Sequence, residues 1–137
     1  MTQPGSVVDS PEYVLDASAI LAQLQGEPGA NIVEAVGSSS VISSVNWAEV
    51  LQKVIAQGSR ETEDVRRDLE SAGLQILPFT VEDAEYTAQL CLNARRAGLS
   101  LVDRACLSLA HRLRLPALTA DRAWSALDLE IEVRLIR

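Results

Sequence analysis

The sequence predicts a single α/β domain built on a mainly parallel sheet with helices on both faces. Short apolar runs with β-branched residues alternate with longer segments of helical periodicity, the pattern of βαβ units. A length of 137 residues suits one compact domain with a sizeable core. Hydrophobic residues make up 47% and charged residues 23%, which is typical of a folded globular protein and not of a disordered one.

Apolar periodicity and turn residues define the expected elements. The expected strands cover residues 13–15, 40–44, 74–79, 117–119 and 131–136. The expected helices cover residues 18–25, 30–36, 46–57, 61–72, 81–97 and 101–114, with a short last helix at 121–126. Glycine follows several of these helices, as at Gly58 and Gly98, and glycine is the residue that most often ends a helix.

The first twelve residues, MTQPGSVVDSPE, are polar and lack the basic start and apolar stretch of a secretory signal. We expect residues 1–12 to be a flexible extension and residues 13–137 to form the domain. No apolar run reaches the roughly 18 residues that a membrane span requires. Two isolated cysteines, Cys91 and Cys106, and a single histidine, His111, make neither a disulfide framework nor a zinc site. These features favour a reducing cytoplasm.

The net charge of -7 argues mildly against an extended surface for nucleic acid. Residues 95–122 differ from the rest, because six arginines and only two acids, Asp103 and Asp121, give this segment +4 and leave -11 for the remainder. Two interpretations stay open. The segment is either a basic helix face of the common kind or the binding region for an anionic ligand near its two acids.

Four acids are expected to converge on one edge of the sheet. Asp16 follows the first strand, Asp121 follows strand 117–119, and Glu49 lies on the first turn of the helix after strand 40–44. Ligands in such folds bind outside the carboxyl ends of the strands. Asp103 lies on the first turn of a largely apolar helix, where a carboxylate needs a partner because desolvating a charge is costly.

Each of the four acids also has a local explanation. The patterns match two simple caps and two capping boxes: Asp16, Asp121, Asn46-x-x-Glu49 and Ser100-x-x-Asp103. Glu49 is also spaced to pair with Lys53 one turn later. The remaining fifteen acids fall mostly in stretches such as VEDAE, which we interpret as solvated helix faces. A cap is the simpler reading of any single acid, whereas four acids at one edge favour a functional site.

Four carboxylates in one cleft raise one another's pKa values unless a cation neutralises them. Carboxylate oxygens select hard ions such as Mg²⁺ or Mn²⁺. The sequence therefore predicts that Asp16, Asp103 and Asp121 bind such an ion, directly or through water, with Glu49 close by. This arrangement suits metal-assisted hydrolysis of a phosphodiester, with the nearby arginines holding a nucleic-acid backbone.

Four stretches in this order resemble the PIN-domain ribonucleases, in particular the VapC-type toxins of bacterial toxin–antitoxin pairs: VLDASAI, ISSVNWAEV, LSLVDRACLSLAHRL and LPALTADRAW. The resemblance runs from about residue 13 to the end of the chain. The acids of the family pattern fall on Asp16, Glu49, Asp103 and Asp121. Ser18 and Thr119 match small hydroxyl positions that resemble residues supporting the site.

The resemblance implies a five-stranded parallel sheet of order 3-2-1-4-5 with helices on both faces. It also implies homodimers, for which we expect the helix at 81–97 to be the contact. The implied activity is that of a Mg²⁺-dependent endoribonuclease that cleaves cellular RNA, such as tRNA or rRNA, and is neutralised by an antitoxin. The alternative is a non-catalytic RNA- or protein-binding module on the same fold. A phospho-accepting receiver domain is disfavoured, because the only lysine is Lys53 and the LQILPF strand carries no acid.

Overall fold

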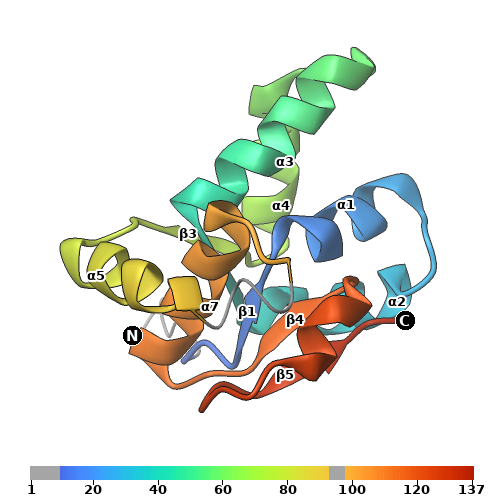
Figure 1. Cartoon of the computed structure of the whole chain (residues 1–137). Helices are drawn as coiled ribbons and strands as arrows, with labels where there is room; N and C mark the ends of the chain where they lie inside the picture. The colour runs from blue at the N-terminus through green and yellow to red at the C-terminus, as the bar shows by residue number, and fades with distance from the viewer. Residues whose placement is uncertain (1–9, 93–97) are drawn as a thin grey trace, which may run out of the picture.

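A computed structural model describes residues 10–92 and 98–137 of the chain (Figure 1). The strands are β1 (Tyr13–Leu15), β2 (Ser40–Ser43), β3 (Gln75–Leu77), β4 (Ala117–Thr119) and β5 (Val133–Leu135). The α-helices of the described residues are α1 (Ala17–Gln25), α2 (Ala30–Val36), α3 (Ser44–Gln57), α4 (Thr62–Ser71), α5 (Val81–Gln89) and α7 (Leu101–Leu113). Two 3₁₀ helices, η2 (Gly37–Ser39) and η3 (Arg122–Ala126), complete the described elements.

The strands form one parallel sheet of order β3-β2-β1-β4-β5, as predicted. β1 pairs with β2 on one side and with β4 on the other, so the direction of winding reverses between β1 and β4. Ligand sites of such sheets lie at this switch point, outside the carboxyl ends of the strands. Asp16 directly follows β1, and Asp121 lies two residues beyond β4.

Each face of the sheet buries its own core, because successive side chains of a strand point to opposite faces. Leu15 and Ile42 face a core that includes residues of α1, α2, α3 and α4. Val14 and Val41 face the other core, which is formed mainly with α7. Figure 1 shows α5 beside α7 and shows α3 and α4 side by side, projecting away from the sheet. No helix within the described ranges is both long and apolar enough to cross a membrane.

Several boundaries differ from the sequence-based expectation. α3 begins at Ser44 because the Ser43 hydroxyl accepts a hydrogen bond from the Val45 amide, which caps the helix two residues early. α5 ends at Gln89 with Leu90 as its C-cap; the Leu90 amide donates to the Tyr86 carbonyl at 3.1 Å, and the Leu90 side chain is buried. The rest of the helix expected at 81–97 falls partly on residues 93–97, outside the described residues.

The last short helix is a 3₁₀ helix, and the last strand covers three residues instead of six. The flexible extension expected at residues 1–12 also falls mostly outside the described ranges and stays a prediction. Just before β1, the Glu12 amide donates to the Ser39 carbonyl at 2.7 Å.

Candidate active site

Asp16 is the most buried of the four predicted site acids, with 4% of its surface exposed. Its Oδ1 accepts hydrogen bonds from the Ser18 hydroxyl at 2.7 Å and from the Ala19 amide at 2.9 Å. Its Oδ2 accepts from the Thr119 hydroxyl at 2.6 Å. Asp16 is therefore the N-cap of α1, as the local explanation predicts, and is also fixed to the neighbouring strand β4.

Two hydroxyls connect the carboxyl ends of β1 and β4. Thr119 Oγ1 donates to Asp16 and accepts from the Asp121 amide at 3.0 Å. Ser18 Oγ donates to Asp16 and accepts from the Ala120 amide at 2.9 Å. These bonds hold the chain segments that carry Asp16 and Asp121 in a fixed relation. The structure thus gives Ser18 and Thr119 a supporting role of the kind that the resemblance implied.

Burial raises the pKa of Asp16 from 3.8 to about 6. The hydrogen bonds from Thr119, Ser18 and the Ala19 amide oppose this rise, because they favour the charged form. The negative charge of Asp103 adds a smaller increase. Desolvation of the carboxylate is therefore the dominant effect at this position.

Glu49 and Asp103 complete an acidic cluster with Asp16. Glu49 is half-buried on the second turn of α3, and its pKa is raised first by burial and then by the charge of Asp103, while Lys53 opposes the rise. Cys106 lies fully buried one turn after Asp103, and burial together with the charges of all three acids raises the pKa of its thiol. Asp16, Glu49 and Asp103 thus lie close enough to influence the same groups.

Asp103 and Asp121 each serve as a helix cap. Asp103 Oδ2 accepts from the Ser100 amide at 3.0 Å, and Ser100 Oγ accepts from the Asp103 amide at 3.0 Å, which confirms the predicted capping box. Asp121 is exposed, and its Oδ1 accepts from the Ala123 amide at the start of η3. Asp121 is connected to Asp16 through Thr119 and not through its own carboxylate.

The predicted capping box Asn46-x-x-Glu49 is wrong. Because Ser43 caps α3, Asn46 lies inside the helix and Glu49 lies one turn further along than expected. Asn46 is 1% exposed, and its Nδ2 donates to the Val102 carbonyl of α7 at 3.1 Å. Sequence reasoning missed this residue, although its spacing from Val50 places it on the buried stripe of α3.

Two arginines of the basic segment contact α5. Arg104 donates to the Thr87 carbonyl at 2.9 Å, near the carboxyl end of α5. Arg112 forms a two-pronged pair with Asp83, whose side chain is 1% exposed. The prediction that VEDAE is a solvated helix face is therefore wrong for Asp83, which is buried. The sequence gives no local sign of this, because the partner Arg112 lies 29 residues later in the chain. The Arg112 guanidinium and the Thr80 cap hold the pKa of Asp83 below its ordinary value despite burial.

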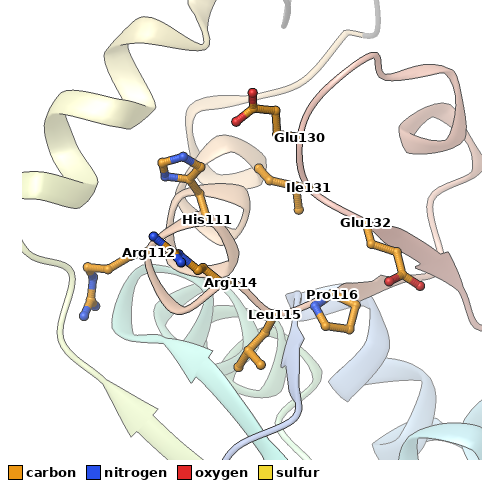
Figure 2. A pocket seen from close by; sticks show the side chains of 8 residues that line it. All are labelled: His111, Arg112, Arg114, Leu115, Pro116, Glu130, Ile131 and Glu132. Atoms are coloured by element: carbon orange, nitrogen blue, oxygen red, sulfur yellow. The ribbon is translucent and has the colours of Figure 1, made fainter.

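The acidic cluster does not coincide with the 630 Å³ pocket shown in Figure 2. Its lining residues come from the end of α7 and from the segments before β4 and β5: His111, Arg112, Arg114, Leu115, Pro116, Glu130, Ile131 and Glu132. This pocket lies at the amino ends of the strands, whereas the acids lie at the carboxyl ends. A hollow of about 340 Å³ does adjoin the cluster, running along α3 from Glu49 past Lys53 to Gln57.

The donor set of the acidic cluster suits a hard divalent cation, since it consists of carboxylate oxygens supported by hydroxyls. Within residues 10–92 and 98–137, no three His, Cys, Asp or Glu side chains stand close enough together to hold an ion directly. Mg²⁺, however, is usually bound by only one or two carboxylates and keeps several waters. The residues therefore fit an ion that some of the acids contact through water.

Comparisons with known structures show the same fold in other proteins. A toxin–antitoxin complex from Klebsiella pneumoniae has a chain of 21% identity and TM-score 0.73, over 92% of this chain and 98% of that one. DNA-bound VapBC from Salmonella typhimurium has a chain of 18% identity and TM-score 0.67, and the match covers 93% of this chain and 99% of that one. FitAcB from Neisseria gonorrhoeae has a chain of 24% identity and TM-score 0.63, and the match covers 88% of this chain and 95% of that one.

At these identities the likeness shows the shared fold. No curated protein matches the sequence. The PIN domain family model matches residues 13–129, which is most of the chain. The chain belongs to the PIN domain family.

Proposed function

We propose that this protein is a divalent-metal-dependent endoribonuclease and the toxin of a toxin–antitoxin pair. The observation that carries the proposal is the cluster of Asp16, Glu49 and Asp103, drawn from β1, α3 and α7 to the carboxyl edge of the sheet in a PIN domain. Asp121 follows β4 at the same edge. A binding module has no need of a third carboxylate, that of Asp103, whose charge raises the pKa of both Asp16 and Glu49.

Asp16, Asp103 and Asp121 are the residues proposed to hold the cation. A bound divalent ion supplies an activated water and offsets negative charge on the phosphate and the leaving oxygen. Asp16 is held by three hydrogen bonds, so its carboxylate offers a fixed ligand position. Asp103 and Asp121 each use one oxygen as a cap, and within the described residues the other oxygen accepts no hydrogen bond.

Glu49 is suited to a proton-transfer role. It is half-buried, and burial and the charge of Asp103 raise its pKa above the ordinary value. A carboxylate of raised pKa is a better acceptor for a proton from the attacking water. The proposed role of Lys53, one turn further along α3, is to contact an RNA phosphate at the hollow that it lines with Glu49.

The proposed protein partner is a small antitoxin. Several structures of the same fold are toxin–antitoxin complexes, and a basic side chain of such a partner could pair with the three acids of the cluster.

A second copy of the chain is proposed to pack on α5. Val81 is 74% exposed, and Ala84 and Ala88 are exposed on the same side, so this helix carries an uncovered apolar face.

The proposal is tested by expression and by cleavage. Expression of the protein alone is expected to arrest growth, and Asp16→Ala or Asp121→Ala to abolish the arrest. Asp64→Asn, which changes an exposed acid on α4, is the matched control and is expected to remain toxic. Purified protein is expected to cleave structured RNA with Mg²⁺ or Mn²⁺ and to lose this activity in excess EDTA.

The alternative is a PIN domain that binds RNA or protein without cleaving it. Two results would favour it: toxicity that survives Asp16→Ala, or RNA cleavage that persists in excess EDTA. RNA binding that is unchanged by EDTA, without any cleavage, would support the same alternative.

A further inference from the structure

Asn46 occupies an unusual position for an amide side chain. It is 1% exposed and lies between α3 and the first turn of α7, where its Nδ2 donates to the Val102 carbonyl. Glu49 follows Asn46 by one turn on the same helix, and Asp103 directly follows Val102. Asn46 therefore lies between the two backbone segments that carry these acids.

The carbonyl oxygen of Asn46 has no hydrogen-bond partner among the described residues and is buried. Leaving a buried acceptor unpaired is unfavourable, because the oxygen has lost its hydrogen bonds to solvent, so such a group calls for a specific explanation. Exchanging the amide's oxygen and nitrogen does not remove the problem, because the oxygen would then face the Val102 carbonyl, which is another acceptor. None of the residues in the described ranges 10–92 and 98–137 supplies a donor to this oxygen.

We propose that Asn46 is a positioning residue of the metal site, whose Oδ1 accepts a hydrogen bond from a water in the outer shell of the cation. This inference rests on the proposed function. Water is the donor we assign, because buried polar groups that lack a protein partner are commonly bonded to buried water, and both neighbouring segments carry an acid of the proposed site. Partners of this kind orient the inner ligands, and their loss lowers metal affinity by roughly 10–100-fold.

Two substitutions separate the acceptor from the donor of Asn46. Asn46→Leu keeps the branched shape and the number of heavy atoms of the side chain, and removes both the acceptor and the donor. Asn46→Asp keeps an acceptor oxygen but loses the donor to the Val102 carbonyl. Isothermal titration with Mn²⁺ is expected to show roughly tenfold or greater loss of affinity for Asn46→Leu and wild-type or tighter affinity for Asn46→Asp. Should Asn46→Leu not fold, Asn46→Ala replaces it with the same expectation.

Ser108→Ala is the matched control. Ser108 is equally buried on α7, and its hydroxyl bonds to Thr87 at 2.6 Å and to the Arg104 carbonyl, on the side that faces α5. This variant is expected to lower the melting temperature and to leave Mn²⁺ affinity unchanged. A merely structural Asn46 would behave in the same way as Ser108.

The outcomes distinguish the inference from the proposed function. If wild-type protein binds no Mn²⁺, or if Asp16→Asn binds as tightly as wild type, the metal site itself fails. If wild-type binding depends on Asp16 but Asn46→Leu binds equally well, the inference alone is overturned. Equal losses in Asn46→Leu and Asn46→Asp also overturn it, because the contact with Val102 would then be what matters.

Discussion

Replacing Asp16 by asparagine is expected to reveal what this buried charge costs the metal-free protein. Burial raises the pKa of Asp16 from 3.8 to about 6. This rise corresponds to about 3 kcal/mol of preference for the protonated form in the folded state. Below about pH 4 both states are protonated, and the stabilising preference is fully present. As pH rises to about 6 the unfolded chain releases its proton first, so the free energy of unfolding falls by that amount.

The Asp16→Asn variant carries no charge at this position at any pH, so it should lose this dependence. The new side-chain oxygen can still accept from Ser18 and the Ala19 amide. The bond from Thr119 to Asp16 Oδ2 is lost or reversed, at a cost of about 1–2 kcal/mol. At about pH 7.5 without metal, Asp16→Asn should therefore be more stable than wild type by about 1–2 kcal/mol, and near pH 4 it should be slightly less stable.

The assay is urea denaturation in EDTA across the range from about pH 4 to pH 7.5. The difference in unfolding free energy between Asp16→Asn and wild type should grow by about 3 kcal/mol over this range. Adding Mn²⁺ should stabilise wild type through preferential binding to the folded state and should have little effect on the variant. Asp64→Asn should follow the wild-type curve. A difference that does not change with pH would refute the burial argument.

Three further predictions concern other acids and the assembly. Asp103→Asn keeps an acceptor for the Ser100 amide but removes a charge beside Asp16 and Glu49, so it should raise the melting temperature in EDTA and weaken Mn²⁺ binding; clear destabilisation would show that the cap dominates. Asp83→Ala removes two hydrogen bonds to Arg112, which is 32% exposed and can be solvated, and should lower the unfolding free energy by about 2 kcal/mol. Because the pKa of Asp83 is lowered, the pair's contribution is present above about pH 4 and is lost as pH falls further; denaturation at several pH values tests this. Light scattering should give a dimer at micromolar concentration and a monomer for a Val81→Glu variant of the exposed α5 face, whereas a wild-type monomer would contradict the assembly.

The order of the elements and the edge at which the acids lie could be predicted because they depend on local signals. Short β-branched runs, glycine after helices and the rule for the carboxyl ends of strands are all readable from the chain. Helix starts are less predictable. Ser43 and Asn46 both have capping side chains, and the hydroxyl of Ser43 forms the cap because β2 ends there.

The contacts between α5 and α7 could not be predicted, since they join residues far apart in sequence. Asp83 lies in an acidic stretch whose composition predicts a solvated helix face, yet its side chain is buried and paired with Arg112. Helical geometry predicts that Arg104 points about 100° away from Asp103 on α7, and the structure shows where it goes, to the Thr87 carbonyl. Periodicity gives the direction of a side chain but not its partner.

The capping role and the proposed metal-binding role of Asp103 and Asp121 are compatible, because they use different oxygens. The capping bonds of Asp103 and Asp121 each occupy one carboxylate oxygen. A cap holds the side chain in one conformation, so less rotamer freedom remains to be lost when a cation binds. Asp16 is the most strongly fixed of the three, since three hydrogen bonds hold its carboxylate. Burial also makes the charge of Asp16 unfavourable without a cation. The local motifs that make Asp16, Asp103 and Asp121 look structural in the sequence are thus what would prepare these three acids for a shared ion.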